Sequence, residues 1–398
     1  MALQDTARHV PVRADGDSWF YDPRIRGIIS QVVVGGLMVI FIFWIINNTA
    51  TNLERAGIAS GFGFWGERAG FDISQTLVGY TVESSYGRAL YIGALNTVLV
   101  AITGCFTAIA LGFVIGIARL SRNWLIQKLS TVYVEIFRNL PPLLVIFFWY
   151  FGVLTLLPNP NQSVELPLEG YLNNRGLIIP RPIFEDGFSL VVWAFAIAVV
   201  AIIGLGIWAK RRQEATGQIF PLLQTSIGLV VGLPLLAFLV SGAPLSFEIP
   251  EASRFNLVGG IQIKPEFIAL YLALSVYTAS FIAEIVRAGI LAVSHGQTEA
   301  AHSLGLRHGP TLRLVVIPQA MRVIIPPLTS QCLNLTKNSS LAVAIGYADL
   351  MSVGGTILNQ TGQAVEIVVI WMSVYLGLSL LTSAFMNWFN AKMSLVER

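Results

Sequence analysis

Eight long apolar runs dominate this sequence and decide what it can fold into. Their approximate limits are 27–47, 89–118, 129–157, 188–208, 219–240, 266–288, 320–346 and 366–389. A run of about 18 to 25 apolar residues is long enough to cross a bilayer as a helix. The third and seventh runs are less regular, because they carry Pro141-Pro142 and Pro326-Pro327. We therefore predict an all-α integral membrane protein with about eight transmembrane helices.

The composition agrees with this class and excludes others. Hydrophobic residues make up 55% of the 398 residues and charged residues 12%, about half of the roughly 25% in soluble proteins. The net charge of +3 is too small to indicate nucleic-acid binding, and two cysteines in apolar runs imply no disulfide framework. Residues 1–26 are polar, and no small-residue cleavage site follows the first run, so we expect that run to be an anchor.

The distribution of Lys and Arg predicts the orientation. One side of the membrane would hold 1–26, 119–128, 209–218, 287–322 and the C-terminus, with sixteen of the 25 basic residues. The other side would hold seven, and Arg138 and Lys337 would lie within spans. Short cytoplasmic loops carry an excess of positive charge. We therefore expect the richer side, with both termini, to be cytoplasmic.

Several short motifs do not indicate chemistry. The spacing of Gly61-Phe62-Gly63-Phe64-Trp65-Gly66 matches a dinucleotide-binding loop, but no strand precedes it and its spacers are bulky. The chain has no Gly-Lys dipeptide and hence no phosphate-binding P-loop; if ATP is used, another chain binds it. His295, His302 and His308 lack the spacing of metal ligands, and we interpret them as solvated loop residues.

One inner loop, at about 294–318, has a strong local pattern. Ser294 with Gln297 fits a capping box, or Thr298 caps the helix directly. Gly305 suits the left-handed position that ends this first short helix, and Pro310 suits the first turn of a second. So short a helix is marginal alone in water. It either packs on its own membrane domain or docks into a cytoplasmic protein.

Glu299-Ala300-Ala301, followed by Gly305 and by Val315-x-Ile317-Pro318, resembles the EAA loop of ATP-binding-cassette (ABC) importer permeases. The family pattern ends in Ile-x-Leu-Pro, so Val315 and Ile317 are a mild departure that leaves Gly305 and Pro318 in register. Other stretches resemble the polar amino-acid branch of that family, in the same order along the chain: Gly93–Thr97, Val134–Pro142, Tyr277–Arg287 and Lys337–Leu341. The resemblance covers about residues 88–390.

The resemblance implies a type-I importer permease in a bacterial inner membrane, without catalysis by this chain. Its partners would be a second permease, a dimer of cytoplasmic ATPase subunits that bind ATP and Mg²⁺, and a periplasmic amino-acid-binding protein. L-amino acids would be imported by alternating access. In that family the EAA loop docks into a cleft on the ATPase. The coupling residues that it implies here are Glu299, Ala300, Ala301, Leu304, Gly305 and Pro318.

The layout departs from the usual five spans of that branch by an inserted pair of spans near 188–240 and an N-terminal extension. It resembles the larger permease of general L-amino-acid or glutamate/aspartate importers. The expected organisation is a cytoplasmic segment 1–26, an anchor helix 27–47, a periplasmic loop 48–88, a transmembrane domain 89–390 that includes the coupling loop, and a cytoplasmic tail 391–398.

Charged and hydroxyl side chains within the spans are the candidate substrate-path residues. They are Glu135, Arg138, Glu284, Arg287, Lys337, Ser339 and Ser340. A charge at the bilayer centre costs about 2.5–3.5 kcal/mol on insertion scales, so it usually faces protein or water. The i,i+3 spacing of the two Glu–Arg pairs also fits simple pairing along a helix. Lys337 either binds the carboxylate of an amino acid or stabilises helix ends.

Two functions from different classes remain at this point. The first is the permease subunit of an ATP-driven importer. The second is a self-sufficient secondary transporter or channel, which needs no ATPase and leaves the inner loop undocked.

Overall fold

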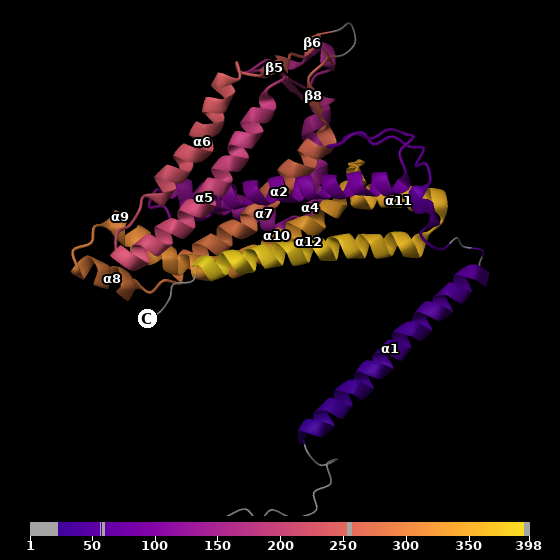
Figure 1. Cartoon of the computed structure of the whole chain (residues 1–398), viewed down its shortest axis with the longest axis horizontal. Helices are drawn as coiled ribbons and strands as arrows, with labels where there is room; N and C mark the ends of the chain where they lie inside the picture. Colours follow the sequence, from indigo (N-terminus) through magenta and orange to yellow (C-terminus); the bar gives the residue numbers. More distant parts are fainter. Residues whose placement is uncertain (1–22, 56, 58–59, 253–256, 394–398) are drawn as a thin grey trace, which may run out of the picture.

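The computed structural model describes residues 23–393, except 56, 58–59 and 253–256. Long helices account for most of it (Figure 1). They are α1 (Pro23–Arg55), α2 (Tyr86–Ala118), α5 (Phe188–Thr216), α6 (Leu222–Val240), α7 (Pro265–Leu291), α10 (Ile317–Asn338) and α12 (Ala364–Met393). Among the described residues, seven helical segments are long and apolar enough to cross a membrane, or eight if one bent pair counts as a span. The predicted all-α membrane class is confirmed.

The third predicted span, 129–157, is not one straight helix. It divides into α3 (Trp124–Asn139) and a second segment that begins with α4 (Pro142–Phe147), and the two are bent by 111°. Leu140 adopts an extended conformation between them, because a residue before proline is disfavoured in the helical region. Beyond α4 the chain continues through π-helical η3 (Phe148–Val153) and η4 (Leu154–Leu156).

The seventh span is longer than the predicted 320–346. Its helical path runs from His308 to Ile345 through α9 (His308–Thr311), the π-helical η6 (Leu312–Val316), α10 and the 3-10 helix η7 (Ser339–Ile345). Pro318 lies at the junction of η6 and α10, where its missing N–H interrupts regular α-helical bonding. A short helix that the sequence did not predict, α11 (Leu350–Thr361), follows η7.

The core of the bundle is the contact between α2 and α7, with α10 packed beside it. Small residues let the backbones approach closely, as is usual between membrane helices. A Cβ atom added at Gly116 would lie 2.7 Å from the carbonyl oxygen of Ala283, and one at Gly112 would lie 2.5 Å from Ile282.

The inserted helices α5 and α6 pack mainly against each other. The most apolar window of α5 is 11% buried and that of α6 is 0% buried within this chain. Figure 1 shows them as a hairpin that rises away from α12. Still more separate is α1, whose apolar window is also 0% buried. It extends the predicted anchor 27–47 at both ends.

Short strands, which the sequence did not predict, join the two loops that flank the α5–α6 hairpin. An antiparallel sheet has the order β1 (Val164–Leu166), β2 (Gly170–Asn173), β3 (Gly176–Ile179) and β8 (Ile261–Ile263). Two smaller sheets pair β4 (Arg181–Phe184) with β5 (Leu245–Glu248), and β6 (Glu251–Ala252) with β7 (Leu257–Val258). We call this set of strands the β cap. In Figure 1 it lies far from α8 (His295–Ser303), which shares its end of the molecule with the α5–α6 turn and the end of α12.

Candidate functional site

The inner loop forms the short helix α8, and its end has the predicted glycine geometry. Gly305 has a φ of +80°. Its N–H donates to the carbonyl of His302 at 2.9 Å, and the N–H of Leu306 donates to the carbonyl of Ala301 at 3.1 Å. These two bonds are the Schellman pattern, in which a left-handed residue satisfies the last free carbonyls of a helix. The helix therefore ends at a defined point.

The beginning of α8 differs from the prediction. The helix starts at His295, and the side chain of Ser294 makes no capping bond; instead the N–H of Gln297 donates to the carbonyl of Ser294 at 3.1 Å. Glu299 is therefore the fifth helical residue and lies beyond the first turn, where the helix dipole acts most strongly. Its carboxylate lies 3.0 Å from Nδ1 of His295, so it faces a histidine one turn earlier.

The small apolar stripe of α8 divides between two faces. Ala301 is only 4% exposed, because α8 packs on η6 of the same chain. Leu304 is 83% exposed and Ala300 is also exposed. The helix thus both packs on its own membrane domain and presents an apolar edge away from it. Of the predicted coupling residues, Glu299, Ala300, Leu304 and Gly305 are exposed, whereas Pro318 is half-buried.

An ion cluster ties three helices together near the α8 end of the bundle. Glu284 of α7 contacts Arg119, the last capping residue of α2, and lies 2.7 Å from Arg287 one turn along its own helix. The second guanidinium nitrogen of Arg119 lies 4.0 Å from Glu135 of α3. The side chain of Arg119 is 10% exposed and that of Glu284 is 25% exposed. The partly buried pair of Arg119 and Glu284 fixes α2 against α7, whereas Glu135, whose side chain is 59% exposed, adds only a weak link to α3.

The ion pair that the i,i+3 spacing of Glu135 and Arg138 would allow does not form among the described residues. Arg138 lies over the ring of Phe281, with its guanidinium carbon 5.7 Å from the ring centre, an arrangement typical of cation–π contacts. Glu135 is oriented toward Arg119 instead. Arg119 was not predicted as a site residue, because its position at the end of an apolar run, next to a loop, does not indicate that α7 packs beside it.

A polar pocket of about 270 Å³ lies between α4, α7 and α10. Its lining is Pro142, Tyr277, Thr278, Phe281, Gln331, Asn334 and Asn338, and we call it the amide pocket. The three amide residues follow i, i+3 and i+7 spacing, so one face of α10 presents them together. Polar residues inside a membrane are expensive and usually functional. The helical spacing of these amides within an apolar run was the sequence signal that could have revealed this pocket.

Amide side chains both donate and accept hydrogen bonds. The pocket therefore offers groups for a ligand that carries both an ammonium and a carboxylate, without a fixed charge in its lining. It opens beside the break between α3 and α4, at Pro142. Along α7, Glu284 follows Tyr277 by seven residues, about 10 Å of helix. The ion cluster thus lies about two turns closer to α8 than the amide pocket.

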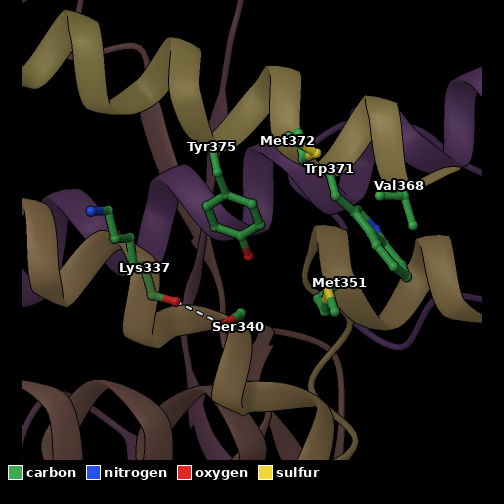
Figure 2. A pocket seen from close by; sticks show the side chains of 7 residues that line it. All are labelled: Lys337, Ser340, Met351, Val368, Trp371, Met372 and Tyr375. Atoms are coloured by element: carbon green, nitrogen blue, oxygen red, sulfur yellow. Dashed lines mark hydrogen bonds between the residues drawn. The ribbon is translucent and has the colours of Figure 1, made fainter. Parts of the chain in front are cut away.

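Lys337 lines a different hollow of about 330 Å³ (Figure 2), together with Ser340, Met351, Val368, Trp371, Met372 and Tyr375. Its ammonium group makes no ion pair with another described residue. Lys337 is in the last turn of α10, where a cation is favoured by the helix dipole. Ser340 donates to the carbonyl of Lys337 at 2.8 Å. Ser339 is 0% exposed and donates to the carbonyl of Thr336, so it does not line this hollow.

The stretch Gly93–Thr97 fixes the turn that follows η7. Asn96 donates to the carbonyl of Ala348 at 2.8 Å, and the hydroxyl of Thr97 accepts the N–H of Leu350 at 3.1 Å. Asp349 is fully buried and caps α11 by accepting the N–H of Ser352. These contacts hold the end of the seventh span against α2, which gives this stretch a structural role.

Comparison with known proteins places the chain in a family. Residues 108–395 match the family described as "binding-protein-dependent transport system inner membrane component". The chain is 62% identical to the general L-amino acid transport system permease protein AapQ of Rhizobium johnstonii, over 96% of this chain and 95% of that protein. It is 51% identical to the putative amino-acid ABC transporter permease protein YhdX of Escherichia coli, over 96% and 98% of the two chains.

A third relative is the glutamate/glutamine/aspartate/asparagine transport system permease protein BztB of Rhodobacter capsulatus. It is 42% identical over 95% of this chain and 96% of its own length. These relatives match nearly the whole chain, so the similarity includes the inserted hairpin and the β cap as well as the core. The chain belongs to the family of inner membrane components of binding-protein-dependent transport systems.

Proposed function

We propose that this chain is the transmembrane subunit of an ABC importer that carries L-amino acids from the periplasm to the cytoplasm. The observation that carries the proposal is the 62% identity, over almost the full length, to a permease of a general L-amino acid transport system. A multi-pass permease component provides the path for the substrate and not the hydrolysis of ATP.

The proposed partners are a second permease, an ATPase dimer that binds ATP and Mg²⁺, and a periplasmic amino-acid-binding protein. Ala300 and Leu304 form an exposed apolar edge of α8. This edge supports an ATPase contact, because a partner that covers Leu304 removes its apolar surface from water, which is favourable. Pro318 would act indirectly, since it lies where η6 passes into α10.

One continuous helical segment connects α8 with the amide pocket. Residues 308–345 form one helical course that starts beside α8 and carries the amides Gln331, Asn334 and Asn338. A displacement of α8 by the ATPase would therefore shift these amides relative to Tyr277 on α7. The ion cluster at Glu284 would hold α2, α3 and α7 together as the opposing unit. This arrangement supports alternating access around the amide pocket.

In the proposed orientation α8 is cytoplasmic and the β cap is periplasmic. The sixteen-to-seven division of basic residues supports it. Two single-cysteine variants test it, Arg212→Cys in the α5–α6 region and His302→Cys in α8. A membrane-impermeant thiol reagent applied to intact cells should label neither, and labelling of either from outside would reverse the orientation.

The energy source separates this function from that of a secondary transporter. The complex, reconstituted in proteoliposomes with binding protein outside, should accumulate labelled L-glutamine only when ATP and Mg²⁺ are enclosed. Ionophores that collapse proton and sodium gradients should leave the uptake unchanged. Uptake that follows an ion gradient and ignores ATP would establish the secondary-transporter alternative.

A further inference from the structure

A second polar pocket, of about 390 Å³, lies where the β cap meets the start of α7. Its lining is Ser74, Tyr150, Asn174, Arg175, Gln262, Lys264, Pro265 and Glu266, and we call it the outer pocket. The volume is within the range of small-molecule sites. It shares no residue with the amide pocket or with the hollow at Lys337.

The β2–β3 turn holds the tip of this pocket in a fixed position. Asn174 and Arg175 form the turn, and the buried Asn173 accepts the N–H of Arg175 at 2.8 Å. Asn174 donates through its N–H to the carbonyl of Pro158 at 3.0 Å. At Gly176 the φ is +115°, and a Cβ atom would collide with the backbone of Ile263. The glycine thus lets the turn lie directly against the start of α7.

Two cations of the outer pocket lack an opposing charge. Neither Arg175 nor Lys264 makes an ion pair with another described residue. Lys264 donates only to the neutral amide of Gln262, at 3.1 Å, and Glu266 accepts the hydroxyl of Tyr150 at 3.1 Å. Two cations against one carboxylate leave the lining with a formal charge of +1. The start of α7 adds free N–H groups and the positive end of its dipole.

The same pocket has groups for a cation. The carboxylate of Glu266 has no ion-pair partner among the described residues, and the side-chain oxygen of Asn174 is buried without a hydrogen-bond partner there. A buried acceptor of this kind is stabilised by a donor. Two cationic side chains and one carboxylate thus line one small hollow, which is the pattern that a zwitterion requires.

We propose that the outer pocket binds a free L-amino acid by its main-chain groups, before the amino acid enters the membrane domain. The α-carboxylate lies between Arg175, Lys264 and the start of α7, and the α-ammonium lies toward Glu266 and Asn174. The net positive lining favours acidic and neutral amino acids over basic ones. The identity of the ligand rests on the proposed function; the existence of a polar ligand site does not.

Protection of an introduced thiol tests the proposal at the site itself. The variant carries Cys105→Ala and Cys332→Ala, which remove the native thiols, and Ser74→Cys, which introduces one at the pocket. The complex that contains this variant is assembled in nanodiscs without binding protein. Saturating L-glutamate should slow labelling by a maleimide at least fivefold, and L-lysine should slow it less. Thr76→Cys, exposed in the same loop outside the pocket, should show no protection.

The second part of the experiment removes the two cationic side chains. In the double variant Arg175→Gln and Lys264→Gln, the rate of maleimide labelling in the presence of L-glutamate should be within twofold of the rate without it. Arg181→Gln, a change in β4 outside the pocket, should keep the protection. If the double variant does not assemble, Lys264→Gln alone should weaken protection, since its side-chain bond is to Gln262 only.

Three results would overturn the proposal. These are equal labelling with and without L-glutamate, protection that survives the double variant, and, in a separate run with binding protein added, protection that appears only with the binding protein and does not depend on an amino acid. The last result would assign the cluster to protein docking. Failure of the proposed function is a separate outcome, seen as no ATP-dependent amino-acid uptake by the unmodified complex.

Discussion

The bundle core and the inserted hairpin are both built from apolar helices, but their helices pack in opposite ways. On α2, Gly112 and Gly116 are in contact with α7 at distances that leave no space for a methyl group. On α6, a Cβ atom added at Gly228 or Gly232 would have no other atom within 4 Å. Glycine in the core therefore allows close helix contact, whereas glycine in the hairpin is not constrained by neighbours within this chain.

The charged residues show the same contrast. In the core, Glu284 is shared by Arg119 and Arg287 and joins α2 to α7. In the hairpin, Lys210 and Glu214 are 4.0 Å apart on one helix, with side chains 79% and 65% exposed. In the core, partly buried charges thus join two helices, whereas in the hairpin the charges lie at its exposed end. Matched substitutions in the two regions can break or sharpen this comparison.

The largest effect is expected from Gly116→Leu. The new side chain would have to displace the backbone of Ala283, and overpacking a close helix contact costs about 1–3 kcal/mol or more. The yield of assembled complex, measured by size-exclusion chromatography, should fall at least tenfold. Gly228→Leu in α6 should assemble normally. Equal yields for the two variants would show that the α2–α7 contact is not tight.

The second effect concerns the ion cluster. Glu284→Gln leaves Arg119 without its main partner, and breaking a buried pair costs several kcal/mol, whereas an exposed pair contributes about 0–1 kcal/mol. Because Glu284 is partly exposed, we expect the contact between α2 and α7 to weaken by about 1–2 kcal/mol, so that the fraction of transport-competent complex, and with it the uptake rate, falls about tenfold. Glu214→Gln in α5 should stay within twofold. A normal uptake rate for Glu284→Gln would mean that the cluster does not brace the core.

The predictability of these regions follows from the range of the interactions that form them. The long helices and the end of α8 depend on local sequence, such as the apolar runs and the pair Gly305 and Pro310, and the sequence revealed them. The β cap depends on pairing between β3 and β8 across the whole hairpin, and strands of two to four residues have too little local pattern to be recognised.

The candidate site was predictable only in part, for the same reason. The pairing of Glu284 with Arg287 lies within one helix turn and follows from spacing. Its contact with Arg119 joins residues 165 positions apart, and no local pattern indicates it. Ser339 and Ser340 are neighbours in sequence, yet the change from α10 to η7 buries one hydroxyl and leaves the other at the hollow beside Lys337.

The third prediction addresses the amide pocket. Asn334→Ala removes one of three amides from the lining, and a hydrogen bond to a charged ligand group contributes about 1.5–3 kcal/mol. Uptake of L-glutamine should fall about tenfold, while complex yield and basal ATP hydrolysis stay unchanged. Gln224→Ala on the exposed face of α6 is the matched control. A tenfold loss in both variants, or in neither, would mean that the amide pocket has no specific role in transport.

The smallest effect is expected at the end of α8, and the hairpin again supplies the control. Gly305 and Gly217 both lie just after the end of a helix, and their φ angles are +80° and +72°. A Cβ atom added at either position would have no other atom within 4 Å. Valine at a left-handed position costs at least about 1 kcal/mol, so Gly305→Val and Gly217→Val carry the same local strain. They differ in their surroundings. Gly305 follows Leu304, the exposed residue proposed to contact the ATPase, whereas Gly217 lies in the α5–α6 turn, for which no such contact is proposed.

If α8 is the coupling element, strain at Gly305 loosens its last turn and misplaces Leu304, and ATPase affinity should fall about fivefold, the equivalent of about 1 kcal/mol. Gly217→Val should leave that affinity within twofold. The measurement is titration of the purified ATPase onto the permease in nanodiscs, with substrate-stimulated ATP hydrolysis as the second readout. Equal losses in both variants would indicate a general effect of helix strain. No loss in either would remove α8 from the coupling path, and the ATPase contact would then have to be sought on another segment at the same end of the bundle, such as the α2–α3 connection beside Arg119.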